Sequence, residues 1–483
     1  MAFESQPVAA DSGSKSPPPP SHTLKRELNA WSLVALGVSS TIGAGIFVIT
    51  GMAAAHQAGP AVALSYVIAG VACLCTGLCY AELAAMSPEA GSAYTYAYAS
   101  FGKLVAWIIG WDLILEFLFQ AASAAVGWSG FLTAMLQQWG LHLPLCLADA
   151  PLELTSSHQL RLTGACFNLP AVTLIVAQSA LLYVGVRESA TVLKVVVGLL
   201  LAVILTIIIA GLFHVDPQNW HPFVPPNSGR LGVFGWSGVM RAAAVVFFSY
   251  TGFEAISTAT REARNPGRDL PIGLLGCLAI CGVLYLLTAL VMTGLVHYEK
   301  LGGKSAIVTA LQAGGPALAW LVPTATIGIV IGLAAGAMGI MYAQIRIFYA
   351  MASDGLLPRQ FAIVHPCHRT PQWGTLVVGA ACALIAGVLP LEVLGELVSI
   401  GTLLAFSIVC LCVLVLRFRA PGRPRPFRAP AVAAVAPLGI LICVYLMVNL
   451  PLDTWLRLIV WMAVGFGIYA AYGRQAARRN AER

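Results

Sequence analysis

Asp112, Glu116 and Glu254 are acidic residues that lie inside long apolar runs, where a charged side chain is costly. Asp112 and Glu116 belong to a run over approximately 102–137, and Glu254 belongs to a run over approximately 236–259. A charge at the centre of a bilayer costs about 2.5–3.5 kcal/mol on insertion scales, so such residues usually face a cavity. A carboxylate there can attract a cationic group, exchange a proton, or accept hydrogen bonds between helices. The residues alone leave these roles open.

Asp112 precedes Glu116 by four residues, so the two side chains share one face of a helix. Two carboxylates that lie close together repel each other, and this arrangement suits the handling of a proton. The alternative is that Asp112 lies near the membrane surface and is simply solvated.

Gly43 and Gly45 form a second chemical signal at the centre of the apolar run over approximately 32–54. A glycine inside a helix costs roughly 1 kcal/mol relative to alanine. Two glycines one residue apart do not share a helix face, so they predict a helix that stops and restarts. The N–H groups and positive dipole end of a helix restarting near Gly45 would bind an anion such as a carboxylate. An intact helix with closely packed glycines is the alternative.

The composition identifies an integral membrane protein. Of the 483 residues, 59% are hydrophobic and 10% are charged, whereas soluble domains contain about 25% charged residues. The net charge of +7 follows from membrane topology and predicts no nucleic-acid partner. We expect no cofactor and no metal site.

Twelve apolar runs are long enough to cross a lipid bilayer, which predicts an all-α polytopic fold. They cover approximately 32–54, 61–86, 102–137, 169–186, 190–213, 236–259, 271–296, 317–351, 373–390, 393–416, 432–450 and 453–473. The third and eighth runs exceed one perpendicular crossing, so we expect them to be tilted or to extend beyond the bilayer. Residues 1–30, which include a proline-rich stretch, are expected to form a disordered tail.

The basic residues predict the orientation. With twelve spans, twenty of the 27 Lys and Arg residues fall on the side of both termini and five fall on the other side, with Lys194 and Arg241 inside spans. The positive-inside rule places both termini in the cytoplasm. Cys146 and Cys166 share one polar loop on the other side, where they can pair or remain free thiols.

The sixth run has the same character as the first. The segment Val245–Glu254 turns abruptly from apolar to polar and contains Gly252 at mid-span. Two interrupted helices five spans apart predict two halves of inverted topology, and such pairs indicate a substrate site near the midplane.

The residues at these positions resemble a known family. The motifs include Ile42-Gly43-Ala44-Gly45-Ile46-Phe47, Tyr80-Ala81-Glu82-Leu83, Pro88–Tyr98, Trp111–Glu116, Val186–Ala190, Phe248–Glu254, Glu262–Gly273 and Arg346–Met351 followed by Asp354–Pro358. Over residues 30 to 375 the chain resembles the amino acid–polyamine–organocation superfamily, and within it the cationic amino acid transporter group.

The resemblance implies a five-plus-five inverted repeat with two broken helices and two extra helices. The implied parts are a first repeat over 31–213, an external loop over 214–235, a second repeat over 236–416, a cytoplasmic linker over 417–431, two further spans over 432–473 and a tail over 474–483.

The resemblance also implies a site for an α-amino acid. Backbone amides of Gly43, Ala44, Gly45 and Ile46 would hold the carboxylate, and the ammonium would lie near Thr41, Ile42, Phe248, Ser249 and Thr251. The positive N-terminal end of a half-helix suits the carboxylate, and the negative C-terminal end of a half-helix suits the ammonium.

The membrane carboxylates have implied roles as well. Glu116 is placed to meet a substrate side chain, which favours arginine or lysine, and Glu254 would tie the broken helices together or serve as a proton site. For each, a hydrogen bond between helices with no transport role is the alternative.

One position departs from the family pattern. Proton-coupled relatives carry a lysine in the fifth span where this chain has Leu200, and the neighbouring Lys194 lies six residues earlier, about 9 Å along a helix. Lys194 can act in coupling or extend to the membrane surface. Proton coupling and facilitated uniport therefore both remain open.

These features predict an amino acid permease that works by alternating access in the plasma membrane, with a bacterial inner membrane favoured by composition. A cationic substrate is the first hypothesis, and proton-coupled transport of small neutral amino acids is the alternative. An amino acid sensor with little flux is a third. We find no nucleophile elbow, phosphate loop or metal-ligand spacing that would indicate an enzyme. The oligomeric state is not predicted.

Overall fold

The computed structural model describes residues 28–86, 93–154, 160–184, 190–303, 305–365 and 370–481, without the side chains of 190–194, 261 and 471–481. The predicted N-terminal tail before residue 28, the motif residues 87–92 and 185–189, and the Lys194 side chain lie outside this part. The helices are α1 (Ala30–Thr41), α2 (Thr50–Ala53), α3 (Val62–Met86), α4 (Ala93–Phe101), α5 (Lys103–Gln138), α6 (Leu145–Ala148), α7 (Leu169–Val184), α8 (Ala190–Leu212), α9 (Gly235–Val246), α10 (Ala255–Thr258), α11 (Pro266–Leu295), α12 (Ala306–Ala313), α13 (Pro316–Ala319), α14 (Leu321–Ser353), α15 (Gln372–Val388), α16 (Leu391–Arg419), α17 (Val432–Val448) and α18 (Leu452–Ala481).

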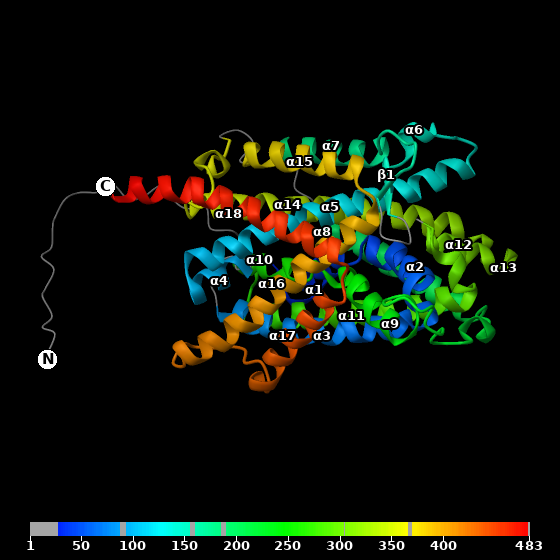
Figure 1. Cartoon of the computed structure of the whole chain (residues 1–483), viewed down its shortest axis with the longest axis horizontal. Coiled ribbons are helices and arrows are strands. Elements are labelled where there is room, and N and C mark those ends of the chain that lie inside the picture. Colours follow the sequence, from blue (N-terminus) through cyan, green and yellow to red (C-terminus); the bar gives the residue numbers. More distant parts are fainter. Residues whose placement is uncertain are drawn as a thin grey trace, which may run out of the picture.

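The long helices run roughly along the longest axis of the molecule (Figure 1). Within the described residues, eight helical segments are long and apolar enough to cross a membrane, and the four helices α1, α7, α15 and α17 are apolar but shorter. Helix length alone does not determine the number of membrane crossings, so twelve crossings remain a prediction. The 36 residues of α5 extend about 54 Å at 1.5 Å per residue. This exceeds a hydrocarbon core of about 30 Å, so tilting or extension follows.

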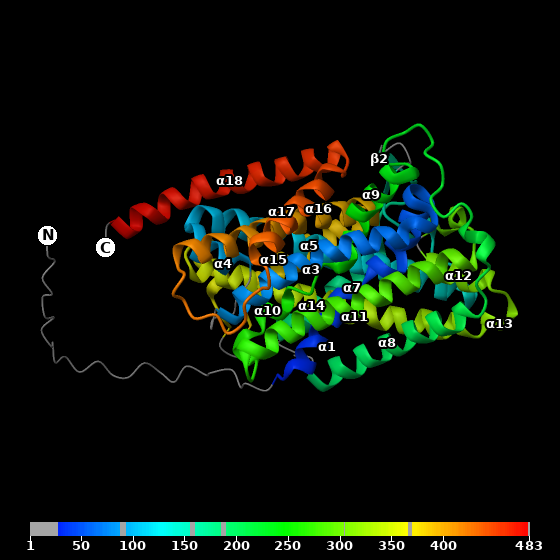
Figure 2. The ribbon, with the colours of Figure 1, turned by 90° about the horizontal axis from the view of Figure 1, so that it is seen from below.

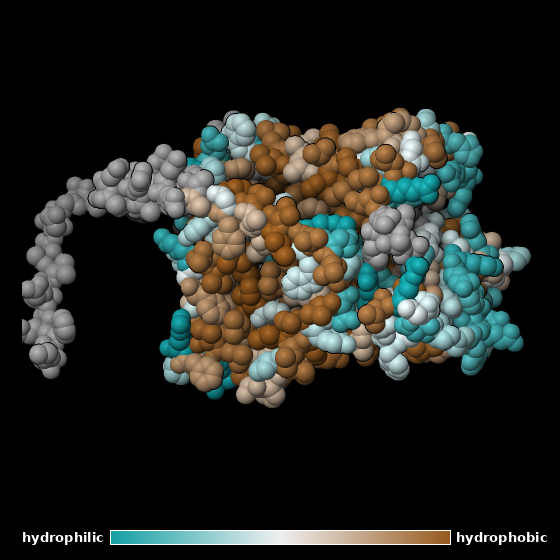
Figure 3. All heavy atoms as spheres, in the orientation of Figure 1, coloured by the Kyte–Doolittle hydropathy of each residue, from teal (hydrophilic) through white to brown (hydrophobic). Residues whose placement is uncertain are grey.

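The surface has the polarity expected of a membrane protein. Apolar residues cover much of the middle of the visible face, and hydrophilic residues gather toward the two ends of the long axis (Figure 3). Helices α8 and α18 lie on opposite edges of the bundle (Figure 2). Exposed leucine, isoleucine and valine side chains on these helices, such as Leu199 and Val460, are therefore expected to face lipid.

The centre of the bundle is formed by helices from both halves of the chain. Helix α5 packs along α14 and α16, and α3 packs along α11, while α1 contacts α11, α14 and α8. Helix α1 begins at an N-cap in which Asn29 Oδ1 accepts a hydrogen bond from the N–H of Ser32 at 2.9 Å. Helix α11 begins with Pro266, where a missing N–H costs no intrahelical bond.

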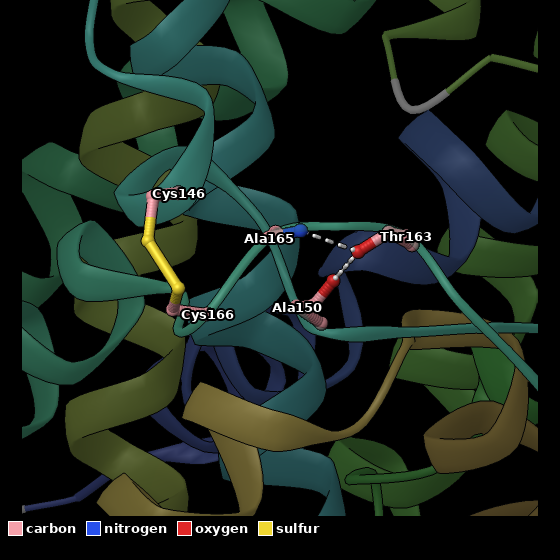
Figure 4. Close-up of a disulfide and its surroundings, with 5 residues drawn as sticks. All are labelled: Cys146, Ala150, Thr163, Ala165 and Cys166. Atoms are coloured by element: carbon pink, nitrogen blue, oxygen red, sulfur yellow. Dashed lines mark hydrogen bonds between the residues drawn. A yellow bond between two sulfur atoms is a disulfide. The ribbon is translucent and has the colours of Figure 1, made fainter.

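A small antiparallel hairpin is an exception to the all-α prediction. Strands β1 (Leu152–Leu154) and β2 (Leu160–Leu162) pair in the segment between α6 and α7. Beside it, Cys146 and Cys166 form the disulfide that the sequence left open (Figure 4). In the same region Thr163 Oγ1 donates to the carbonyl of Ala150 at 2.8 Å.

The start of the described chain is attached to the segment that follows α10. The N–H of Leu28 donates to the carbonyl of Glu262 at 2.9 Å, and the N–H of Arg264 donates to the carbonyl of Leu28 at 2.9 Å. These bonds form an isolated parallel bridge between Leu28 and Ala263. Arg346 of α14 adds an ion pair with the Glu262 carboxylate at 3.3 Å.

The linker after α16 is fixed by a buried acidic residue at the end of α3. Glu82 accepts hydrogen bonds from Arg417 Nε at 2.9 Å and Nη2 at 2.7 Å. Arg425 Nε lies 3.2 Å from the same carboxylate, and the N–H of Ala429 donates to it at 2.8 Å. Because Glu82 is 1% exposed, this cluster joins the linker to the helical bundle.

Candidate functional site

The first apolar run is interrupted where its central glycines lie. Helix α1 ends at Thr41, Ile42 is extended (φ −76°, ψ 104°), and the chain resumes at Gly45 in the π-helix η1 (Gly45–Ile49). The restarted helical chain continues through α2, with its N-terminal amides in the protein interior. A helix start of this kind presents N–H groups that lack intrahelical partners.

The second interruption separates α9 from α10. Helix α9 passes into a 3₁₀ turn, η5 (Phe247–Tyr250), after which Thr251 is extended and Gly252 has φ +106°. This positive φ favours glycine. The N–H of Gly252 donates to both oxygens of the Glu254 carboxylate, at 2.9 and 3.0 Å. Glu254 thus accepts a hydrogen bond from a backbone N–H group within the same helix interruption.

The two interruptions contact each other closely. A Cβ atom on Gly45 would lie 2.6 Å from Ser249 Cα, and one on Gly252 would meet the Ser40 carbonyl. Neither position accommodates a side chain without displacement of backbone. The two glycines therefore allow the broken ends of α1 and η5 to touch.

Tyr285 of α11 connects both broken ends through its hydroxyl group. This oxygen lies 3.0 Å from the Thr41 carbonyl and 2.7 Å from the Ser249 carbonyl. A tyrosine hydroxyl has one hydrogen to donate, so the two carbonyls share one donor. Tyr66 of α3 contributes a second connection, because its hydroxyl bonds Thr50 Oγ1 at 2.6 Å and Ser249 Oγ at 3.0 Å.

We expect a Tyr285→Phe variant to be less stable than the parent protein. The substitution removes the donor that two buried carbonyls share, and an unsatisfied buried acceptor costs about 1–3 kcal/mol. Thermal unfolding of the purified variant should show a melting temperature several degrees lower. Tyr445→Phe is the matched control, because Tyr445 is 52% exposed. A melting temperature equal to that of the parent would contradict the bridging role.

A small cavity lies beside the first interruption. The lining residues are Ser40, Thr41, Ile42, Gly43, Ala44, Gly45, Gln120, Ala124, Phe248, Leu333, Gly336 and Ile340. Backbone of the broken helix forms one wall, and the facing walls from α5 and α14 are mostly apolar.

The cavity brings together part of the predicted site. Thr41, Ile42, Gly43, Ala44, Gly45 and Phe248 are among the lining residues. Ile46, Ser249 and Thr251 are buried beside the two breaks and are outside this lining. A Cβ on Gly43 would meet nothing within 4 Å, so this glycine has open space beside it.

The predicted acidic residues are buried away from the cavity lining. Asp112 and Glu116 are each 0% exposed, and Glu254 is 4% exposed. The carboxyl group of Asp112 has no hydrogen-bond partner among the described residues, whereas that of Glu116 interacts with the Thr402 hydroxyl. Glu116 interacts electrostatically with Glu254 and Asp112, so the three carboxyl groups form one buried acidic cluster.

Leu200 occupies the position where proton-coupled relatives are expected to carry a lysine. It is 3% exposed, and its side chain lies against Gly332 of α14, next to the cavity residue Leu333. This contact is apolar. Lys194 belongs to α8, and its coupling role stays a prediction.

Sequence reasoning missed Gln120, Ala124, Tyr285 and the α14 wall. Leu333, Gly336 and Ile340 recur at intervals of three and four residues, which is the spacing of one helix face. That pattern identifies a face but not what the face meets. Gln120 carries the clearest available signal, because it is a polar residue four positions after Glu116 in an apolar run.

Interrupted helices that meet beside a small cavity, within a bundle of apolar helices, define a polytopic integral membrane protein. A profile of the family described as Amino acid permease matches residues 28–468. The chain belongs to this amino acid permease family, as the resemblance in its motifs implied.

Individual relatives span several named activities. The chain is 40% identical to the branched-chain amino acid permease BcaP of Bacillus subtilis (strain 168), over 98% of this chain and 97% of that protein. It is 41% identical to the methylthioribose transporter of the same organism, over 95% and 96%. It is also 36% identical to cationic amino acid transporter 4 of Homo sapiens, over 86% of this chain and 63% of that protein.

Proposed function

We propose that this permease transports α-amino acids with small or branched apolar side chains by alternating access. The observation that carries the proposal is the lining of the cavity. The broken backbone from Ile42 to Gly45 lies on one wall, and Ala124, Phe248, Leu333 and Ile340 line the space beside it. The backbone wall suits the charged carboxylate and ammonium groups of an amino acid, and the apolar wall suits an apolar side chain.

Backbone groups hold the substrate in this proposal. The N–H groups of Gly43, Ala44, Gly45 and Ile46 bind the carboxylate at the start of the restarted helix. The ammonium lies toward Thr41, Ile42 and Phe248, near the end of α1. Ser249 and Thr251 act from outside the lining by positioning the second break.

A cationic substrate is the second candidate. The buried cluster of Asp112, Glu116 and Glu254 favours it, because buried carboxylates attract arginine or lysine side chains. An extended cationic side chain would have to reach past Gln120 to meet Glu116. The names of the relatives include both branched-chain and cationic amino acids.

We further propose twelve spans arranged as five-plus-five inverted repeats, with the extra helices α17 and α18 and both termini in the cytoplasm of a bacterial cell. The distribution of Lys and Arg supports this orientation. The Cys146–Cys166 disulfide supports it as well, because disulfides persist on the oxidising side of a membrane. Leu200 in place of a lysine supports uniport over proton coupling.

Uptake into liposomes that hold the purified protein tests these alternatives. We expect labelled leucine to enter at least about tenfold faster than arginine, because an unpaired guanidinium in an apolar cavity costs several kcal/mol. The rate should be the same with and without an inward proton gradient. Uptake of arginine alone would favour the cationic candidate, and gradient-driven uptake would restore proton coupling. Binding of leucine without flux would indicate a sensor.

A further inference from the structure

Gln120 of α5 is the polar side chain that lines the apolar side of the cavity. It is 5% exposed, and its Nε2 group donates to Thr251 Oγ1 at 3.0 Å. Its Oε1 atom is buried without a hydrogen-bond partner among the described residues. A buried acceptor that lacks a partner is costly, and a ligand in the cavity is a natural source of the missing donor.

Hydrogen-bond geometry fixes which end of the Gln120 amide remains unpaired. Thr251 Oγ1 donates its single hydrogen to the Phe248 carbonyl at 2.8 Å. It can therefore only accept from Gln120, so the NH₂ group must face Thr251. The carbonyl oxygen of the amide is left for another partner.

Several backbone carbonyls of the predicted ammonium site already accept hydrogen bonds. The Phe248 carbonyl accepts from both the N–H of Thr251 at 3.2 Å and its hydroxyl, which uses both of its lone pairs. The carbonyls of Thr41 and Ser249 are already contacted by Tyr285. An ammonium group has three hydrogens, so an additional acceptor in the lining would complete its hydrogen bonding.

We propose that Gln120 Oε1 accepts a hydrogen bond from the α-ammonium group of the substrate, and that Thr251 orients Gln120 for this contact. The inference rests on the proposed transport of α-amino acids and adds a side-chain ligand to the backbone site. Through this contact, helix α5 binds the amino group of the substrate directly. Ligand binding is thereby connected through Thr251 to the second helix break.

Binding of leucine and of 4-methylpentanoate, which is leucine without its amino group, tests this contact. Dissociation constants are measured on the full-length protein in lipid nanodiscs. We expect Gln120→Leu and Gln120→Met to weaken leucine binding by about 10- to 100-fold, since hydrogen bonds to charged groups are strong. Binding of 4-methylpentanoate should change less than about twofold, and the preference for leucine should fall accordingly. The methionine variant preserves side-chain length if the leucine variant does not fold.

Gln178 of α7 supplies the matched control. It is also 5% exposed, its Nε2 donates to the Ala334 carbonyl at 2.7 Å, and its Oε1 is likewise without a hydrogen-bond partner among the described residues. It does not line the cavity, so Gln178→Leu should leave the preference for leucine unchanged. Equal loss of both ligands in the Gln120 variants, or loss of neither, would overturn the contact. Absence of leucine binding to the parent protein would overturn the proposed substrate together with the contact.

Discussion

Replacing Gly43 with valine is expected to reduce uptake to background while the protein remains folded. A Cβ on Gly43 has no atom within 4 Å, so the valine side chain enters the cavity without displacing the backbone. Once there, it occupies space that the substrate needs, so we expect it to block binding rather than folding. Liposome uptake and thermal unfolding of the purified variant measure the two effects separately.

Two further glycine variants make this result specific. Gly339→Val is the matched control, because Gly339 is an exposed position of α14 where an added Cβ would also meet no atom within 4 Å, and uptake should be retained. Gly45→Ala should instead destabilise the fold, since its Cβ would lie 2.6 Å from Ser249 Cα. Normal uptake by Gly43→Val would exclude the cavity as the substrate site.

Removal of the Glu82 carboxylate is expected to cause the largest loss of stability. Glu82→Ala leaves the guanidinium groups of Arg417 and Arg425 and the N–H of Ala429 without their shared acceptor. Breaking a buried ion pair in this way typically costs about 3–5 kcal/mol. The melting temperature of the purified variant should fall by several degrees, and the yield of folded protein should fall with it.

Glu299→Ala provides the comparison for this variant. Glu299 pairs with His297 at 3.7 Å, and its side chain is 70% exposed. Exposed ion pairs contribute about 0–1 kcal/mol, so its removal should scarcely change the melting temperature. If both variants unfold at the same temperature as the parent, the Glu82 cluster does not fix the linker to the bundle.

The interruption of the first helix could be predicted because it is encoded locally. Gly43 and Gly45 disfavour a continuous helix wherever they occur in an apolar run, and the structure interrupts α1 at Ile42. Asp112 and Glu116 could be predicted to share a face from their spacing alone. The family itself could be predicted from motifs such as Phe248–Glu254, which combine several local constraints.

The composition of the cavity could not be predicted in the same way. Glu116 and Gln120 are one turn apart on α5, and only Gln120 lines the cavity. Which of them reaches the site depends on the rotation and depth of α5 against α14, and many distant contacts determine both. Tyr285 is similar, because its bonds to Thr41 and Ser249 join segments that lie more than thirty residues before it in the sequence.

The attachment of Leu28 to the segment behind α10 also bears on when the molecule can move. Its two backbone hydrogen bonds are short-range and directional, so they are either intact or absent. Any rearrangement that carries Leu28 and the start of α1 away from the residues following α10 must break both bonds, whereas the ion pair of Arg346 and Glu262 joins α14 to the same segment. The amide hydrogens of Leu28 and Arg264 are thus shielded from solvent exchange for as long as these elements stay together. The exchange rates of these two amide hydrogens therefore report how often the two elements separate.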